Sequence, residues 1–334
     1  MKSLQIVVLL LIFLSCGKDD LGINKTLDNN NDARNLEIQD GFTEKSNDSI
    51  SSKTGFNKIQ CGQGGGKANK TGAKIWCWND LNIPNYSNKK GVELAGGDLF
   101  IDSECYEKQI LSSGDMLKFR LDPTNPATQS WCGRDFNMRA EIRTAPWNIR
   151  HSKGTEEWFG WSYTFGENYK IDKNNQWKFF QVHPGITGQP PQIGLEITHE
   201  TQFWDHPGGE IYVTNAGGSL NYSPTGVVPK AGQTVNIVVH VVWGDDTNGL
   251  LQVWMDDKKV YDKQVSTVLA DYPWGGNAKW GIYKWPWAKA DAVVKSKEQG
   301  IESLETYMGS LRIVTRKPGD SNYKKDAYEI VRPN

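Results

Sequence analysis

The stretch VNIVVHVVWGDDTNGLLQVWMD, from Val235 to Asp256, sets the fold class of this chain. Its two apolar runs are rich in Val, Ile, Leu and Trp, most of which favour β-strands. The six residues GDDTNG between the runs have the length and composition of a hairpin loop. DDKK, at Asp256–Lys259, predicts a second turn that leads into Val260 and Tyr261. We therefore expect antiparallel strands in this region.

The same pattern of short apolar runs continues on both sides of this hairpin. Short aromatic and β-branched runs are separated by clusters of Gly, Pro, Asn and Asp, which predicts strands joined by turns. The runs are WFGWSYTF (158–165), QWKFFQVH (176–183), IGLEIT (193–198), EIYVT (210–214) and LRIVT (311–315). The best helical segment is short, around 288–299, and a loop over the sheet is the alternative. The spacing predicts an all-β sandwich in one domain, residues 57–334.

Three further stretches place polar residues at alternating positions. They are RAEIR (139–143), QVH (181–183) and KWGIY (279–283). In a strand, side chains at i, i+2 and i+4 point to one face. The residues that share a face are then Arg139, Glu141 and Arg143, Gln181 and His183, and Lys279 and Tyr283. Cations, an amide, an imidazole and a phenol on one face suit the binding of a carboxylate and the transfer of a proton beside it.

Composition narrows the range of partners. The formal net charge is −1, so no overall basic field indicates a nucleic-acid partner. The chain has 14 tryptophans, which serve either as a large aromatic core or as platforms on which sugar rings stack. Trp285 and Trp287 come directly after Tyr283, and we expect them to be sugar platforms.

The three alternating blocks, in this order, resemble the R-x-E-x-R, Q-[IV]-H and K-x-G-x-Y blocks of jelly-roll polysaccharide lyases. That group includes alginate lyases of family 7, glucuronan lyases, heparin lyase I and jelly-roll ulvan lyases. The resemblance covers about residues 133–314, and both WFGWSYTF and the Val235–Asp256 hairpin resemble the heparin lyase I and glucuronan lyase type. It implies a concanavalin A-like β-jelly roll of two antiparallel sheets with a concave substrate groove. Asn277 and Ala278 before Lys279, and Pro184 after the histidine, depart from the alginate lyase pattern and leave the subfamily open.

The resemblance also implies a reaction, β-elimination at a uronic acid residue of an anionic polysaccharide. The uronate carboxylate must be neutralised so that it can accept developing charge, a role that suits Arg139 and Gln181. His183 is a natural base for the C5 proton, and Tyr283 a natural acid for the departing O4. Alternatively Tyr283 serves as both base and acid, because nearby cations such as Lys279 lower the pKa of a phenol.

Further roles follow from the same resemblance. Arg143 and Lys279 are expected to bind substrate, and Glu141 to orient an arginine. Glucuronan or ulvan is the favoured substrate, and alginate comes next. Structural alternatives remain for each block: a salt-bridge ladder for RAEIR, a core histidine for His183 and simple packing for Tyr283.

The N-terminus reads as a targeting segment. Lys2 precedes the apolar run Leu4–Leu14, which is shorter than the roughly 20 residues that span a bilayer. Ser15 and Cys16 follow directly, and a small residue and a Cys in this place resemble a lipobox; the acidic GKDD after them resembles the export tag of Bacteroidetes surface lipoproteins. We expect a signal peptide at 1–15, lipidation of Cys16 and a flexible tether at 16–56. The predicted location is the outer membrane or cell surface, with a secreted or periplasmic protein as the alternative.

Four cysteines remain, an even number in an oxidising compartment, which predicts two disulfides. Proximity favours Cys61 with Cys77 and Cys105 with Cys132. Their spacing does not match a zinc site. We expect no cofactor in the chemistry, although abundant loop Asp and Asn allow a structural Ca²⁺. The membrane is predicted to be reached only through the lipid anchor, and the protein to be a monomer.

Two other function classes compete with the lyase. A non-catalytic carbohydrate-binding sandwich would keep the tryptophans but would not need the ordered His, Gln, Tyr and Arg set. A sandwich glycoside hydrolase would need two carboxylates about 5 to 9.5 Å apart, and no paired acidic motif on one strand indicates them.

Overall fold

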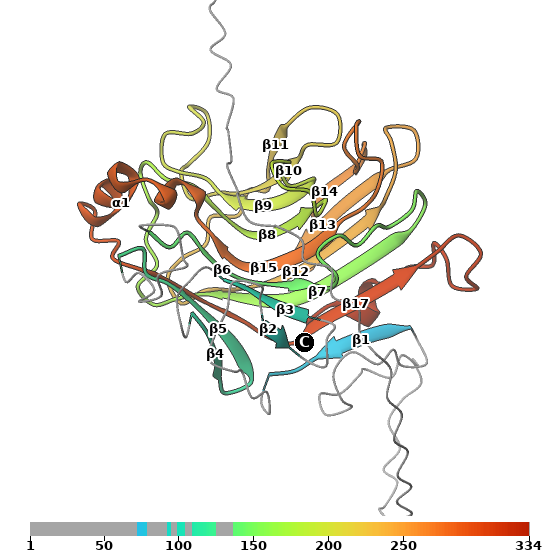
Figure 1. Ribbon diagram of the computed structural model, residues 1–334, viewed down its shortest axis with the longest axis horizontal. Helices are drawn as coiled ribbons and strands as arrows, with labels where there is room; N and C mark the ends of the chain where they lie inside the picture. Colours follow the sequence, from blue (N-terminus) through green and yellow to red (C-terminus); the bar gives the residue numbers. More distant parts are fainter. Residues whose placement is uncertain (1–71, 79–91, 95–98, 104–108, 125–135, 334) are drawn as a thin grey trace, which may run out of the picture. The chain divides into compact units, whose positions relative to one another are not determined.

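The computed structural model describes residues 72–78, 92–94, 99–103, 109–124 and 136–333. All of them belong to the unit Lys58–Asn334. The predicted signal peptide, Cys16 and the tether therefore lie outside the described residues. The described residues form two antiparallel sheets, which confirms the predicted β-jelly-roll sandwich (Figure 1).

The first sheet has nine strands, in the order β14-β13-β12-β7-β16-β5-β4, with β17 pairing both β7 and β1. Its strands are β1 (Ala73–Trp76), β4 (Ile110–Ser113), β5 (Met116–Leu121), β7 (Glu156–Phe165), β12 (Thr234–Val242), β13 (Leu250–Met255), β14 (Lys258–Gln264), β16 (Leu304–Met308) and β17 (Leu311–Arg316). The long β7 pairs with β12 along one side, while β16 and β17 follow one another along its other side.

The second sheet has eight strands, in the order β11-β10-β9-β8-β15-β6-β3-β2. Its strands are β2 (Val92–Leu94), β3 (Leu99–Ser103), β6 (Arg139–Thr144), β8 (Trp177–His183), β9 (Ile193–Ile197), β10 (Ile211–Asn215), β11 (Asn221–Pro224) and β15 (Asn277–Tyr283). The three blocks singled out in the sequence are thus three neighbouring strands, β6, β15 and β8, at the centre of this sheet (Figure 1).

One hydrophobic core lies between the sheets. It takes alternate residues from each strand, such as Phe159 and Trp161 of β7 and Trp280 and Ile282 of β15, all at most 1 % exposed. A smaller apolar cluster on the other face of the nine-stranded sheet joins Trp158 and Val238 to the C-terminal segment. Each sheet therefore has one face in the core and one outer face.

The hairpins predicted from the sequence are present. β12 and β13 pair across the GDDTNG loop, and β13 and β14 pair across Asp256 and Asp257. Both aspartates have positive φ, 47° and 65°, as a two-residue turn with the right-handed twist of a hairpin requires.

Helix is scarce in the described segments. A 3₁₀ turn, η2 (Trp285–Ala288), leads into α1 (Ala290–Lys297), and α2 (Tyr328–Val331) lies near the C-terminus. α1 confirms the one helix expected from the sequence. Among the described residues, no helix combines the length and the apolar character needed to cross a membrane.

Cys77 is disulfide-bonded. Cys61, Cys105 and Cys132 lie outside the described residues, so the pairing stays a prediction.

Candidate active site

The register of the eight-stranded sheet brings the three sequence blocks together in rungs. Lys279 on β15 lies between Arg143 on β6 and Gln181 on β8. Tyr283 lies opposite Arg139 in the same way. These side chains stand on the outer face of the sheet, because the residues between them in sequence are in the core. We call this surface the polar face, defined by Arg139, Glu141, Arg143, Lys178, Gln181, His183, Lys279 and Tyr283.

Lys178 reaches the polar face through a β-bulge. A regular strand would turn it away from Gln181, three positions later. The register of β8 shifts between Lys178 and Phe180, so that Phe179 is an extra residue relative to β9. Phe179 and Phe180 are consequently both fully buried in the core. Lys178 lies opposite Tyr283 in the register and donates to Glu196, with an Nζ–Oε2 distance of 2.5 Å.

The bulge continues into β15, where Gly281 accommodates it. The register of β15 against β8 shifts between Trp280 and Tyr283. Gly281 has φ +133°, and a Cβ atom there would lie 2.2 Å from the Ala140 carbonyl oxygen. Its own carbonyl accepts a hydrogen bond of 2.8 Å from Tyr163. The glycine of KWGIY is thus required by the backbone, and it lets Tyr283 follow Lys279 on the same face.

Asp102 holds the cations of the polar face, and sequence reasoning missed it. This β3 residue accepts from Lys279 Nζ at 2.7 Å. Its carboxylate is also 3.5 Å from Arg139 Nη1 and 3.8 Å from Arg143 Nε. Burial tends to raise the pKa of Asp102, but Lys279 and Arg139 outweigh this and hold it well below its usual range. Asp102 therefore stays ionised and fixes three positive charges in place.

Glu141 and Gln181 form a buried pair behind these cations. Both side chains are 1 % exposed, and Gln181 Nε2 donates to Glu141 Oε1 at 2.6 Å. Glu141 Oε2 lies 3.2 Å from Arg139 Nε, which agrees with its expected role in orienting an arginine. Burial raises the pKa of Glu141 to about 7, although Lys279 and Arg139 oppose the shift.

Both ring nitrogens of His183 are bound to backbone. The Gly185 N–H donates to Nδ1 at 3.1 Å, so Nε2 carries the proton and donates to the Gln189 carbonyl at 3.0 Å. The ring also stacks on Trp147, with centroids 4.9 Å apart. Burial, then the charges of Lys279 and Arg139, lower the pKa of His183 to about 3. The imidazole is therefore neutral near pH 7, with both nitrogens occupied.

Tyr283 stands among cations at the open part of this face. Its side chain is half-buried, the Arg139 guanidinium carbon lies 4.8 Å from its ring centroid, and Trp285 packs beside it at 5.6 Å. Lys178 Nζ lies 5.4 Å from the Trp285 ring. A negative charge that develops on Tyr283 would therefore lie close to the Arg139 guanidinium.

The two tryptophans predicted to be sugar platforms differ in how far they are buried. Trp285 is half-buried and stays available on the polar face. The prediction for Trp287 is wrong, because its side chain is 0 % exposed and its Nε1 donates to Ser296 of α1. A 3₁₀ turn has three residues per turn, so two positions after Trp285 the chain faces the interior.

Trp147 is a better platform that the sequence did not reveal. It follows β6 in a loop, is half-buried, and lies under three groups of the polar face. Lys279 Nζ is 4.5 Å and the Arg143 guanidinium carbon 5.6 Å from its ring, and His183 stacks on it. Nothing in a linear pattern marks Trp147, since only the fold brings it to the other three residues.

No group of three or more His, Cys, Asp or Glu side chains in the described part of the chain has the geometry to hold a metal ion. The structural Ca²⁺ and the absence of a required cofactor stay predictions.

Two packed antiparallel sheets, with a face that carries cations around a phenol, define the class of jelly-roll lyases that act on polysaccharides. A family model described as "Polysaccharide lyase" matches residues 104–307. The chain belongs to this family and is a polysaccharide lyase. Its match runs from just before β4 to β16 and includes all three alternating blocks.

Solved structures of similar fold are lyases of low sequence identity. An endo-β-1,4-glucuronan lyase from the fungus Trichoderma reesei has a TM-score of 0.48 and 14 % identity, over 78 % of this chain and 98 % of that one. A family 7 alginate lyase, A1-II′, with bound substrate has 0.44 and 13 %, over 64 % and 84 %. An alginate lyase from Pseudomonas aeruginosa has 0.44 and 16 %, over 63 % and 87 %. No curated protein matches the chain.

Proposed function

We propose that this protein cleaves a uronic-acid-containing polysaccharide by β-elimination on the polar face. The observation that carries the proposal is the row of three cations on the face that carries Tyr283: Asp102 fixes them at distances of 2.7 to 3.8 Å, and Arg139 lies beside the Tyr283 ring. Such an arrangement fits an anionic sugar better than a neutral one, because it offers fixed positive charge where a carboxylate would sit.

The uronate carboxylate is expected to meet Arg139 first. Arg139 has a 22 % exposed side chain, the largest exposure among Arg139, Arg143 and Lys279. Gln181 is 1 % exposed, and its Nε2 keeps a second hydrogen that Glu141 Oε1 does not take. Neutralising the carboxylate lets it accept the charge that develops when the C5 proton leaves.

Tyr283 is the proposed base and acid. Its phenolate oxygen takes the C5 proton, the C5–H electrons form the C4=C5 double bond, and the C4–O4 bond breaks. The same phenol then returns the proton to O4, so the products are an unsaturated uronate end and a free hydroxyl. One residue serves both steps when the C5 proton and O4 lie on the same side of the ring.

His183 is then a positioning residue. Its two nitrogens bind the Gly185 N–H and the Gln189 carbonyl, which leaves no lone pair for the C5 proton in this arrangement. Its stack on Trp147 holds that ring under Lys279 and Arg143. These contacts support Tyr283 over His183 as the proposed proton carrier.

For the substrate we propose a glucuronate polymer, glucuronan or ulvan, with alginate next. The support is the likeness of the Val235–Asp256 hairpin and of WFGWSYTF to the glucuronan and heparin lyase type. The export signals at the N-terminus support a lipoprotein that meets such polymers outside the cell.

A substrate screen tests the reaction and the substrate together. The purified protein is incubated separately with glucuronan, ulvan, heparin and alginate, and absorbance is followed near 235 nm, where the C4=C5 product absorbs. We expect the fastest rise on glucuronan or ulvan. A rise on alginate alone would overturn the substrate assignment, and no rise on any of the four would overturn β-elimination.

A further inference from the structure

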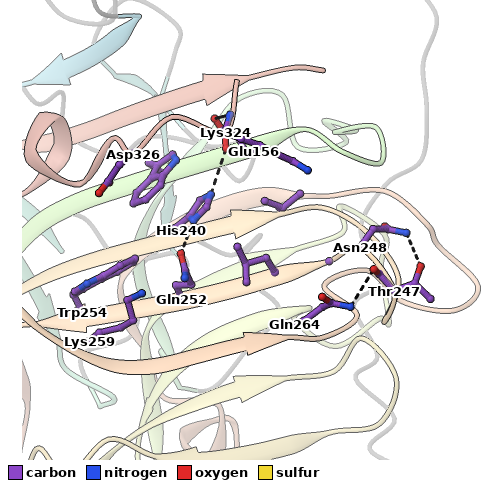
Figure 2. A pocket seen from close by; sticks show the side chains of 14 residues that line it. Glu156, His240, Thr247, Asn248, Gln252, Trp254, Lys259, Gln264, Lys324 and Asp326 are labelled. Carbon is purple, nitrogen blue, oxygen red and sulfur yellow. Dashed lines mark hydrogen bonds and ion pairs between the residues drawn. The ribbon is translucent and has the colours of Figure 1, made fainter. Parts of the chain in front are cut away.

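A second, unassigned pocket lies on the outer face of the nine-stranded sheet, away from the polar face. It has a volume of about 590 Å³ and is built on β7, β12, β13 and β14, with the loop after β12 at one end (Figure 2). Figure 2 shows Trp254, Gln252 and His240 on adjacent strands of its floor, with Thr247, Asn248 and Gln264 at the loop end. We call it the β12–β13 pocket.

The orientation of the polar groups on its floor follows from one carboxylate. Asp262 can only accept, and Gln252 Nε2 donates to it at 2.8 Å. The Gln252 Oε1 atom therefore faces His240 Nδ1, 2.8 Å away, and this nitrogen must carry the proton.

The back of the floor is a buried pair: His240 Nε2 lies 3.5 Å from Glu156 Oε2, a contact that Figure 2 marks with a dashed line. Burial tends to raise the pKa of Glu156, but the hydrogen bond and charge of His240 outweigh it and lower that pKa. Both atoms are buried, so a ligand's hydroxyls are expected to meet the amides and hydroxyls that line the rest of the pocket.

The rest of the pocket suits the same kind of ligand. Trp254 is half-buried and its indole lines the pocket, and Lys259, an exposed residue, lies over that ring at 4.9 Å. The pocket's lysines, Lys259 and Lys324, are balanced by its carboxylates, Glu156 and Asp326. Amides and hydroxyls, from Thr247, Asn248, Gln252 and Gln264, provide most of the remaining polar groups. A flat ring beside amides and balanced charge is the chemistry that binds the C–H face and hydroxyls of a sugar.

We propose that the β12–β13 pocket is an accessory binding site for pyranose units of the polysaccharide, held by stacking on Trp254 and by hydroxyl hydrogen bonds. The identity of the sugar rests on the proposed function, whereas its hydroxyl-rich class rests on the pocket alone. The pocket lies on the other sheet from Tyr283, so it binds a stretch of chain that is not being cleaved. Its effect is to keep a long polymer near the enzyme, and short substrates gain nothing from it.

Calorimetry on a catalytically silent background, Tyr283→Phe, tests the site. A glucuronan hexasaccharide is expected to bind at two sites, and Trp254→Leu in that background to leave one. Leucine keeps apolar packing against Trp158 and Tyr328, and thermal unfolding checks that the variant folds. Lys259→Ala, which removes an exposed charge and uncovers the indole, is expected to retain both sites. A single binding site in the Tyr283→Phe protein would overturn the proposal, and so would two sites after Trp254→Leu is added. Loss of the second site in the Lys259→Ala variant would contradict stacking, because it would show that the ligand is held by an ion pair with Lys259.

Kinetics on the otherwise unchanged enzyme give an independent reading. Trp254→Leu is expected to raise KM for the polymer about three- to tenfold, the size of one aromatic stacking contact, with kcat and the KM for a tetrasaccharide unchanged. An equal rise in KM for polymer and tetrasaccharide would contradict an accessory site.

If the substrate screen shows no lyase activity, binding of cellohexaose, a neutral β-linked pyranose chain, still decides the matter. Binding that Trp254→Leu abolishes would support the pocket while the proposed function fails. Absence of binding by both hexasaccharides would overturn the pocket as well.

Discussion

The two outer faces of this sandwich are built alike and charged differently. On the eight-stranded sheet, Arg139, Arg143 and Lys279 gather around one carboxylate, Asp102. On the nine-stranded sheet, the β12–β13 pocket has as many carboxylates as lysines, beside a half-buried indole. Both faces are antiparallel strands with their other side in the same core. The two faces therefore share a framework of strands and differ in the side chains that the strands carry. These side chains determine whether a face attracts a charged or an uncharged part of a sugar.

The sharpest test of this contrast is at Tyr283. Tyr283→Phe removes the proton carrier but keeps the ring under Arg139, and we expect kcat on the preferred polymer to fall about 10²- to 10⁴-fold. Tyr307→Phe, at a half-buried tyrosine of the other sheet, is the matched control and should keep full activity. Absorbance at 235 nm measures both. Activity of the Tyr283→Phe protein near that of the control would refute the assignment of the proton carrier.

The second test compares carboxylates that hold lysines on the two sheets. Asp102→Asn leaves Lys279, which is 1 % exposed, without its ion-pair partner, and we expect the free energy of unfolding to fall by about 3 kcal/mol. Asp262→Asn breaks an exposed pair with Lys259 and should change it by less than about 0.5 kcal/mol. Urea unfolding of both variants provides the measurement. Equal effects would mean that Asp102 does not anchor the polar face.

The third test separates positioning from proton transfer. His183→Ala loses the stack on Trp147 and two backbone contacts, so activity should fall, but by less than the roughly 10²-fold that marks a residue transferring protons. Because its pKa is about 3, His183 stays neutral from pH 5 to 9. The pH profile of kcat/KM should therefore keep its shape in the variant. Disappearance of an ionisation between pH 6 and 7 would make His183 the base.

The smallest expected effect is a pH dependence that comes from Glu141. Its pKa is about 7, so below pH 7 it is neutral and Arg139 is left for the substrate. Above pH 7 the carboxylate competes, and KM should rise about two- to fivefold between pH 6 and 8. Glu141→Gln should flatten this rise. A parallel rise of KM in wild type and variant would rule Glu141 out as its source.

The same group also affects stability. An acid whose pKa is raised on folding holds a proton more tightly in the folded state. The stabilisation that this gives is fully present below the unfolded pKa of 4.5 and is lost as pH rises through about 7. Urea unfolding between pH 4 and 8 should therefore show a decline that is absent from Glu141→Gln.

Much of the fold could be predicted, because strand alternation and turn chemistry are local signals. The Val235–Asp256 hairpin, β7 and the three alternating blocks of the polar face all follow from period-two patterns and from Asp and Gly at turns. The parts that could not be predicted depend on contacts between distant residues. Asp102 lies 37 residues before Arg139 in sequence and 177 before Lys279, and LFIDS carries no mark of their pairing.

Two local irregularities of the backbone also could not be predicted from the alternation of residues. The position of Trp287 just after Tyr283 predicts a sugar platform, but the 3₁₀ turn places it in the interior. Strict alternation turns Lys178 away from Gln181, whereas the bulge at Phe179 brings both side chains to one face. The face on which a side chain lies cannot be predicted from strand alternation where a bulge or a 3₁₀ turn interrupts the regular strand.

That bulge has a consequence for how this sheet can change. Before and after Phe179, β8 uses opposite phases of the alternation: even-numbered Lys178 shares its face with odd-numbered Gln181 and His183. Removing a single residue there would merge the two phases, and either Lys178 or the pair Gln181 and His183 would have to enter the core. Length is therefore a constrained property of this strand: a one-residue insertion or deletion would turn the side chains of one half of β8 to the opposite face of the sheet.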